Sequence, residues 1–220
     1  MTQPGPATRL IEGVERFQKS VFTEKESLFH QLEKGQSPGV LFITCSDSRI
    51  DPNLLTLTDP GELFVLRNAG NLIPPYDTPG PSGAVATVEY AVLALKVRDI
   101  IVCGHSKCGA IAGLLAPEHL APLPAVKSWL SYAEGVYDEV QKKGLEVAER
   151  LNYAVERNVL KQLEHLRTHP SVIQGLAAGT LRLHGWIYHF EAGKVLAHDP
   201  NHERFVSVAE AWRQPLAAES

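Results

Sequence analysis

The sequence Val40-Leu41-Phe42-Ile43-Thr44 is an unbroken run that is apolar up to its last residue. Such runs are typical of strands buried on both faces, as in parallel sheets. Two further runs of this kind occur at residues 63–66 and 100–103. Between these two runs, residues 83–96 are predicted to form a helix with Ser82 as its cap. Strand, helix and strand at this spacing predict parallel pairing through right-handed crossovers.

The segment that precedes this sheet is predicted to be helical. Leu10, Val14, Phe17 and Val21 recur at helical spacing and form one apolar face. Thr23 and Glu26 form a capping-box pattern, which predicts a second helix over residues 24–34 that stops at Gly35. These helices would either cover their own domain or pack on a partner subunit.

The second half of the chain continues the alternation of helices and strands. Helices are predicted over residues 124–142 and 145–167, and residues 181–190 with 194–197 predict a hairpin at a sheet edge. The expected fold class is α/β: a mostly parallel central sheet with an antiparallel edge strand, flanked by helices. Residues 1–220 are interpreted as a single domain with an N-terminal helical arm (about 9–34), a core (about 35–206) and a frayed tail from Gln214.

Composition restricts the functional class. With 44% hydrophobic and 21% charged residues, the 220-residue chain can bury a full core. Its net charge of −4 argues against a nucleic-acid binder, and no apolar run is long enough for a membrane span. The N-terminus lacks the apolar stretch of a signal peptide, so a cytoplasmic location is expected. Three cysteines do not make a disulfide framework.

Polar segments follow two of the predicted strands directly. One carries Cys45, and the other carries His105 and Cys108. Ligands bind at the carboxyl ends of strands in open parallel sheets, so these three side chains are expected to converge. Two thiolates and one imidazole, with one position left open, are typical of a catalytic zinc site. Cys103 lies inside an apolar strand and is interpreted as core packing.

Asp47 and Arg49 lie within four residues of Cys45, and their pairing has two interpretations. The pair could simply hold the loop. Alternatively, Arg49 could grip Asp47 through a bidentate fork, which keeps this anion from occupying the open metal position. Asp47 could then orient a metal-bound hydroxide toward the substrate. Cysteine-dependent phosphatases need five residues between Cys and Arg, whereas three separate Cys45 from Arg49.

The two segments Cys-Ser-Asp-Ser-Arg (45–49) and Gly-His-Ser-Lys-Cys-Gly (104–109) resemble the signature motifs of β-class carbonic anhydrases. The resemblance extends through residues 61–71, 89–92 and 183–188, and covers most of the chain from Leu10 to about Val206. It implies reversible hydration of carbon dioxide to bicarbonate by attack of zinc-bound hydroxide, with one Zn²⁺ per chain.

The resemblance also implies roles for individual residues. Cys45, His105 and Cys108 match the zinc ligands, and Asp47 and Arg49 match the catalytic dyad. Substrate-binding positions are Gln36, Phe64, Tyr90 and Gly109, and Gln36 points to the plant-like branch. Phe42 stands where the other branch carries a tryptophan of a regulatory bicarbonate site, so no such site is expected.

The family further implies partners and alternatives. Carbon dioxide and bicarbonate are the expected small-molecule partners, and a homodimer that forms a tetramer or larger assembly is the expected state. Hydrolysis of carbon disulfide or carbonyl sulfide, and a zinc-bound scaffold or bicarbonate-sensing subunit without turnover, stay open as alternatives. The chain ends soon after the core, which makes carboxysome association less expected than a free cytoplasmic enzyme.

Overall fold

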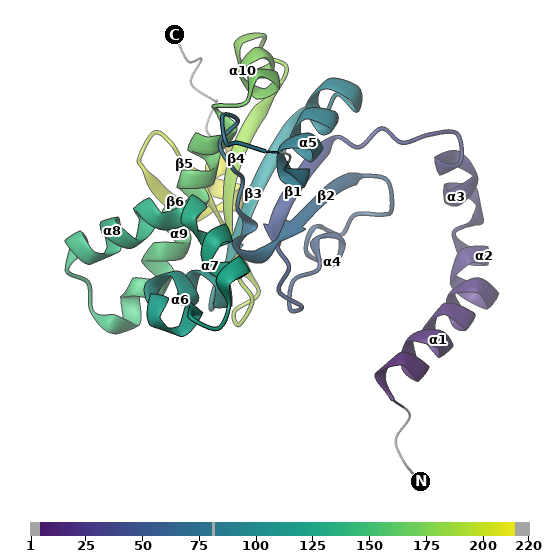
Figure 1. The fold of residues 1–220 in the computed structure, drawn as a ribbon. Helices are drawn as coiled ribbons and strands as arrows, with labels where there is room; N and C mark the ends of the chain where they lie inside the picture. Colours follow the sequence, from purple (N-terminus) through teal and green to yellow (C-terminus); the bar gives the residue numbers. More distant parts are fainter. Residues whose placement is uncertain (1–4, 81, 214–220) are drawn as a thin grey trace. The chain divides into compact units, whose positions relative to one another are not determined.

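The computed structural model describes residues 5–80 and 82–213, and the chain divides into two compact units, Met1–Ser37 and Pro38–Ser220 (Figure 1). The first unit is helical, as predicted: α1 (Pro6–Arg16), a π-helical turn η1 (Phe17–Val21), α2 (Phe22–Glu24) and α3 (Glu26–Leu32). The predicted capping box is wrong. Lys25 occupies the N-cap position of α3, with φ −111° and ψ 16°, and no side chain makes a capping hydrogen bond to this helix.

The second unit is built on one six-stranded sheet in the order β2-β1-β3-β4-β5-β6. The strands are β1 (Val40–Cys45), β2 (Leu63–Asn68), β3 (Asp99–His105), β4 (Arg182–His189), β5 (Lys194–Asp199) and β6 (Arg204–Ser207). The first four run parallel, whereas β5 and β6 run antiparallel to their neighbours. The predicted fold class is confirmed, except that β6 and not β5 forms the antiparallel edge.

Helices α4 (Pro52–Thr56), α10 (Pro170–Ala177) and α11 (Val208–Arg213) were not predicted. The remaining helices are α5 (Gly83–Glu89), α6 (Gly109–Leu115), α7 (Pro124–Leu130), α8 (Glu134–Lys143) and α9 (Val147–Leu166). Ser82 caps α5 as expected, and a π-helical turn, η3 (Tyr90–Ala94), extends that helix. The predicted helix over 124–142 is broken by a 3₁₀ turn at Ser131–Ala133. There the Ser131 hydroxyl donates to the Ser128 carbonyl at 2.7 Å, which competes with the helical hydrogen bonds.

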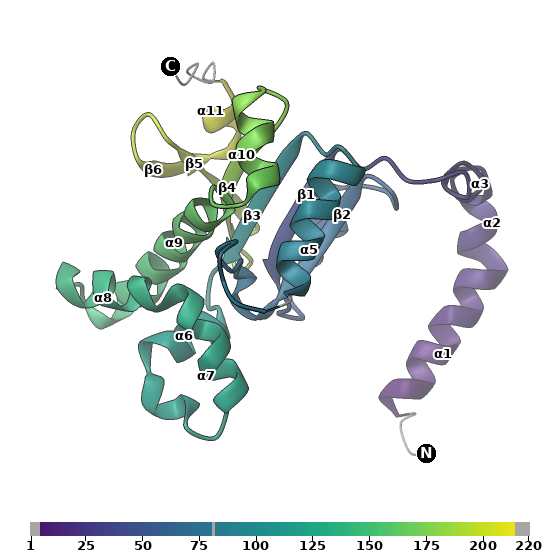
Figure 2. The same cartoon turned by 45° about the horizontal axis from the view of Figure 1, so that its top comes forward.

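The core has a larger and a smaller part on opposite faces of the sheet. Figure 2 shows α5 in front of β1 and β2, on one of these faces. Side chains alternate along a strand, so Leu41, Ile43 and Cys45 belong to the larger part, beneath α5 and α9. Phe42 and Cys103 belong to the smaller part, where the ring of Phe42 meets that of Trp186 at 6.1 Å. The tail from Gln214 lies outside the described residues. No helix within 5–80 and 82–213 is both long and apolar enough to cross a membrane.

Candidate metal centre

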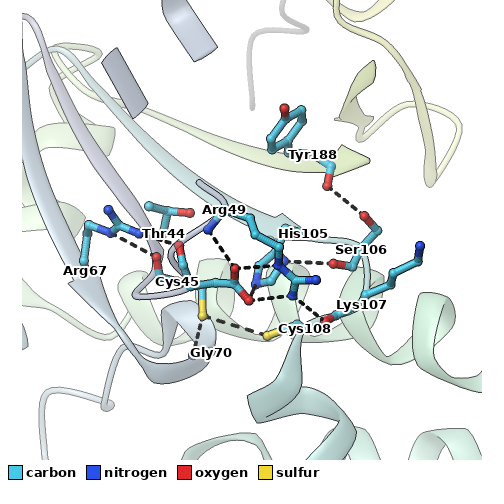
Figure 3. A network of polar contacts seen from close by, with 12 residues as sticks. Thr44, Cys45, Arg49, Arg67, Gly70, His105, Ser106, Lys107, Cys108 and Tyr188 are labelled. Atoms are coloured by element: carbon cyan, nitrogen blue, oxygen red, sulfur yellow. Dashed lines mark hydrogen bonds and ion pairs between the residues drawn. The ribbon is translucent and has the colours of Figure 1, made fainter. Parts of the chain in front are cut away.

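The carboxyl ends of β1 and β3 bring Cys45, His105 and Cys108 together (Figure 3). Cys45 ends β1, His105 ends β3, and Cys108 is the N-cap residue of α6. Because β1 and β3 are parallel neighbours, both strand ends lie at one edge of the sheet. One ligand atom from each residue lies within 4.8 Å of the others, and the two sulfur atoms are 4.0 Å apart. The predicted convergence is confirmed.

His105 presents a free nitrogen to this group. Its Nδ1 lies 2.9 Å from the Ser106 carbonyl, and because a carbonyl can only accept, Nδ1 carries the hydrogen. Nε2 of the neutral ring therefore carries a lone pair. The side chain is fully buried, and Nε2 has no hydrogen-bond partner among the described residues. A buried acceptor in this state costs free energy unless a ligand satisfies it, so it supports metal binding at this point.

The two thiols differ in how readily each loses its proton. The Cys108 thiol donates to the Cys45 sulfur, and the Gly70 amide donates to the same sulfur at 3.3 Å. The Cys108 bond is the main reason why the pKa of Cys45 lies well below that of an ordinary thiol, although burial opposes this. The same bond, together with burial, raises the pKa of Cys108. A divalent cation would displace that remaining proton and be neutralised by two thiolates.

Asp47 and Arg49 form the bidentate fork that the sequence predicted as one of two interpretations. The Arg49 Nε and Nη2 atoms donate to the two Asp47 carboxylate oxygens at 2.8 and 2.7 Å. These hydrogen bonds hold the pKa of Asp47 well below its usual range. Asp47 Oδ2 lies 4.0 Å from His105 Nε2, so the carboxylate is adjacent to the candidate metal position. Both of its oxygens are hydrogen-bonded to Arg49.

Arg67 fixes the loop that carries these groups, a role that was not predicted from the sequence. Its Nε donates to the Cys45 carbonyl at 3.1 Å, and its Nη2 donates to the Asp47 carbonyl at 2.8 Å. The sequence signal was a charged residue near the end of an otherwise apolar strand. In the structure, Arg67 pairs in register with Thr44. Contacts to backbone carbonyls have no sequence signature, so the two partners could not have been identified.

A buried polar chain from α9 holds the other side of the centre. Gln162 accepts from the Ile73 amide at 2.8 Å and donates to Asn158 at 3.0 Å, and Asn158 donates to the Gly70 carbonyl at 3.0 Å. Both side chains are almost fully buried, with 0% and 1% exposure. They fix the loop whose Gly70 amide donates to Cys45. The sequence signal was two amide side chains, one turn apart, inside the helix predicted for residues 145–167.

The residues predicted to bind substrate are not all near the centre. Gly109 is the first residue of α6, next to Cys108, and a side chain added there would meet open space. The Phe64 and Tyr90 rings contact each other at 6.0 Å, but Phe64 pairs with Leu41. That register puts Phe64 four residues, or about 13 Å, from the carboxyl end of the sheet. Gln36 belongs to the first unit.

Cys103 lies apart from the centre, as expected for a core residue. It is fully buried in the smaller part of the core, on the face of the sheet opposite Cys45. Burial raises the pKa of the Cys103 thiol to about 12. The interpretation of Cys103 as core packing is confirmed.

Known proteins are similar to this chain in both sequence and fold. A family model described as carbonic anhydrase matches residues 40–195. A carbonic anhydrase of Pseudomonas aeruginosa is 48% identical over 203 residues, which span 91% of each chain. The solved structure of the β-carbonic anhydrase CcaA superposes with a TM-score of 0.89 at 47% identity, over 91% of each chain. One of two tetrameric β-carbonic anhydrases from Sordaria macrospora superposes with a TM-score of 0.71 at 29% identity, over 87% of this chain and 92% of the other.

Proposed function

Because this chain belongs to the β-carbonic anhydrase family and so catalyses the reversible hydration of carbon dioxide, we propose that it does so with one zinc ion per chain, held by Cys45, His105 and Cys108. The buried convergence of these three donors is the observation that carries the proposal. Three protein ligands leave a fourth position for water, as catalytic zinc sites do. Zinc held there lowers the pKa of a water molecule and so supplies the nucleophile.

The protein's own part in the reaction falls to Asp47 and Arg49. Asp47 accepts from the Arg49 amide and Nε at Oδ1 and from Nη2 at Oδ2, so Oδ2 keeps a lone pair to accept a hydrogen bond from the attacking water. That bond would orient the water toward carbon dioxide. Arg49 holds both carboxylate oxygens by hydrogen bonds. Because the carboxylate then does not bind the metal, the fourth metal position stays open to water.

The substrate pocket is proposed to be shared between two copies of the chain. Carbon dioxide is small and apolar, so Phe64 and Tyr90 suit the walls of its pocket. These rings lie about 13 Å from the ligand end of their own sheet, as judged by strand register. Tyr90 is 51% exposed. We therefore assign Phe64 and Tyr90 to the pocket of the partner subunit, whereas Gly109 lines the pocket of its own chain. The proposal that Gln36 binds substrate rests on the family resemblance alone.

The helical arm supports a homodimer. Its large apolar side chains are exposed to an unusual degree, with Leu10 at 71%, Ile11 at 61% and Val14 at 56%. A helix with so much exposed apolar surface needs a surface to cover it. A second copy is the proposed occupant, and the tetrameric relatives from Sordaria macrospora favour a further pairing of dimers.

Zinc-edge X-ray absorption tests the metal assignment. We expect one zinc per chain with two sulfur ligands at about 2.3 Å, one nitrogen at about 2.0 Å and one oxygen. The matched variants are Cys45→Ser, which removes a proposed ligand, and Cys103→Ser, which does not. A wild-type spectrum with four sulfur ligands, or zinc retained with two sulfur ligands in Cys45→Ser, would contradict the ligand set.

A further inference from the structure

The ring of Phe190 lies against the guanidinium of Arg49, with Cζ 4.4 Å from the ring centroid. Phe190 follows β4 directly and is half-buried. We propose that Phe190 is a positioning residue: its ring holds Arg49 in the orientation that binds both carboxylate oxygens of Asp47. The inference rests on the function proposed above for Asp47 and Arg49, and it adds a residue that the motifs do not include.

The guanidinium is held by its edge and by its face. Along the edge, Nε and Nη2 donate to Asp47, and Nη2 also donates to the Lys107 carbonyl at 3.2 Å. The face is covered by Phe190. The Arg49 side chain is nevertheless 45% exposed, so water competes for the donors along its edge. The cation–π contact adds a restraint on the face of the guanidinium, which the hydrogen bonds along the edge do not supply.

The turn that carries Phe190 is itself tied to the metal centre. The buried Ser106 hydroxyl donates to the Glu191 carboxylate at 2.5 Å, and the Ser106 amide donates to the Tyr188 carbonyl at 3.0 Å. Ser106 directly follows His105. Gly193, with a φ of 60°, closes the same turn. The ring thus has a fixed place relative to the candidate metal ligands.

The consequence of losing the ring follows from charge. Without the face contact, Arg49 can leave Asp47 and reach solvent. Asp47 is an anion 4.0 Å from His105 Nε2, so an uncommitted carboxylate competes for the open metal position. Phe190 would therefore act through Arg49 to keep that position available to water.

The test compares Phe190→Leu, which removes the π face, with Phe190→Tyr, which keeps it. The first readout is the Arg49 Nε–Hε signal in ¹⁵N NMR spectra of the metal-free protein, assigned with Arg49→Lys. A ring-current shift is expected in wild type and Phe190→Tyr and is expected to vanish in Phe190→Leu. The second readout is kcat/KM of the zinc-loaded enzyme, which should fall roughly three- to tenfold in Phe190→Leu and recover in Phe190→Tyr.

The matched control is Phe205→Leu. Phe205 is also half-buried, but its ring contacts His198 at 5.3 Å, and the substitution should move neither readout. Phe190→Met replaces Phe190→Leu if the latter does not fold. An unchanged Arg49 signal, or an unchanged kcat/KM with the signal lost, would overturn the inference. Failure of the proposed function is distinguished by Asp47→Asn: full activity there removes the dyad's role, whatever Phe190 does.

Discussion

At the residue scale, the centre combines groups whose charges cancel in pairs. Cys45 and Cys108 offer two thiolates to a divalent cation, and Arg49 neutralises Asp47 beside them. His105 would bind a metal through Nε2 as an uncharged donor, because Nδ1 carries the hydrogen that it donates to the Ser106 carbonyl. A metal held in this way keeps little net positive charge, so the orientation of the attacking water by Asp47 gains importance.

Asp47→Asn tests that role. The amide keeps the size of the side chain but loses the charge that Arg49 grips and one acceptor oxygen. We expect zinc content to stay at one per chain while kcat/KM for carbon dioxide falls about 100-fold. Stopped-flow hydration with parallel metal analysis measures both. Full activity in this variant would remove Asp47 from the mechanism.

Cys103→Ser tests the choice of cysteines. Cys103 is fully buried on the face opposite the centre, so the hydroxyl should cost about 1–2 kcal/mol of unfolding free energy without affecting zinc. Cys45→Ser is the counterpart and should lose zinc. Metal analysis and thermal unfolding check both variants. Loss of zinc from Cys103→Ser alone would mean that the wrong thiols were chosen.

The convergence of the ligands could be predicted from the sequence because all three follow strands that end at the same edge of the sheet. The fork between Asp47 and Arg49 could be predicted as one of two options, since residues two apart on an extended segment can meet. Phe190 and Arg67 could not be assigned. Their contacts join segments far apart in the chain, and an aromatic residue in a turn or an arginine in a strand has many alternative roles.

At the element scale, α9 is the helix that organises the second unit. Besides packing on β3 and β4, it holds the loop after β2 through Asn158, Gln162 and His165. This loop runs from Gly70, which contacts Cys45, to Tyr76. A buried polar network of this kind gives the loop one defined conformation if all its members are satisfied.

Gln162→Met tests the network. Methionine fits the space but leaves the Ile73 amide and one Asn158 acceptor without partners. We expect the free energy of unfolding to fall by about 1–3 kcal/mol, which corresponds to a fall in Tm of a few degrees. The control is Gln141→Met, at an exposed position of α8, which should leave Tm almost unchanged. Equal Tm values for the two variants would show that the chain of hydrogen bonds contributes little.

The same loop should make stability depend on pH. His165 and His169 donate to the Ile73 and Pro74 carbonyls, and burial lowers the pKa of both imidazoles. The unfolded chain therefore binds more protons near the usual histidine pKa, so the stability present above pH about 6.5 is lost as the pH falls. In the double variant that combines His165→Asn with His169→Asn, Tm should change less between pH 8 and pH 5.5 than in the wild type. The control His119→Asn should behave like the wild type. Identical slopes would contradict this account.

Apolar runs predicted three of the four parallel strands, and β1 and β3 are buried on both faces as this pattern implies. The same expectation is wrong for β2, which lies at the edge of the sheet and leaves Val65 37% exposed. Helix boundaries were less predictable. Nothing in the sequence signals the π-helical turns at residues 17–21 and 90–94, and α4, α10 and α11 are too short to show periodicity. The strand β6 has only four residues, which gives no detectable alternation.

At the scale of the whole molecule, one chain supplies a metal centre at one end of its sheet and the Phe64–Tyr90 pair away from that end. A C₂ dimer would place each pair in the partner's pocket and complete both sites at once. The sequence could suggest the oligomer only through the resemblance and the apolar face of the arm. Which side chains cross the interface depends on the partner's position, which no local pattern encodes. The cytoplasmic location stays a prediction.

Subunit mixing tests the shared pocket. Cys108→Ala chains lack a proposed ligand, and Tyr90→Ala chains lack a proposed pocket wall, so each homodimer should be impaired. Random mixing makes about half of the dimers mixed, each with one intact site, which predicts recovery to about a quarter of wild-type activity. No recovery after verified exchange would place Tyr90 outside the partner's pocket.

Zinc titration of the metal-free protein, followed by stopped-flow carbon dioxide hydration, measures whether hydration depends on one zinc ion at this centre. Activity should rise linearly and stop rising at one zinc per chain, and Cys45→Ser should show no such rise. Activity in the metal-free protein, or full zinc binding without hydration of carbon dioxide, would contradict this expectation.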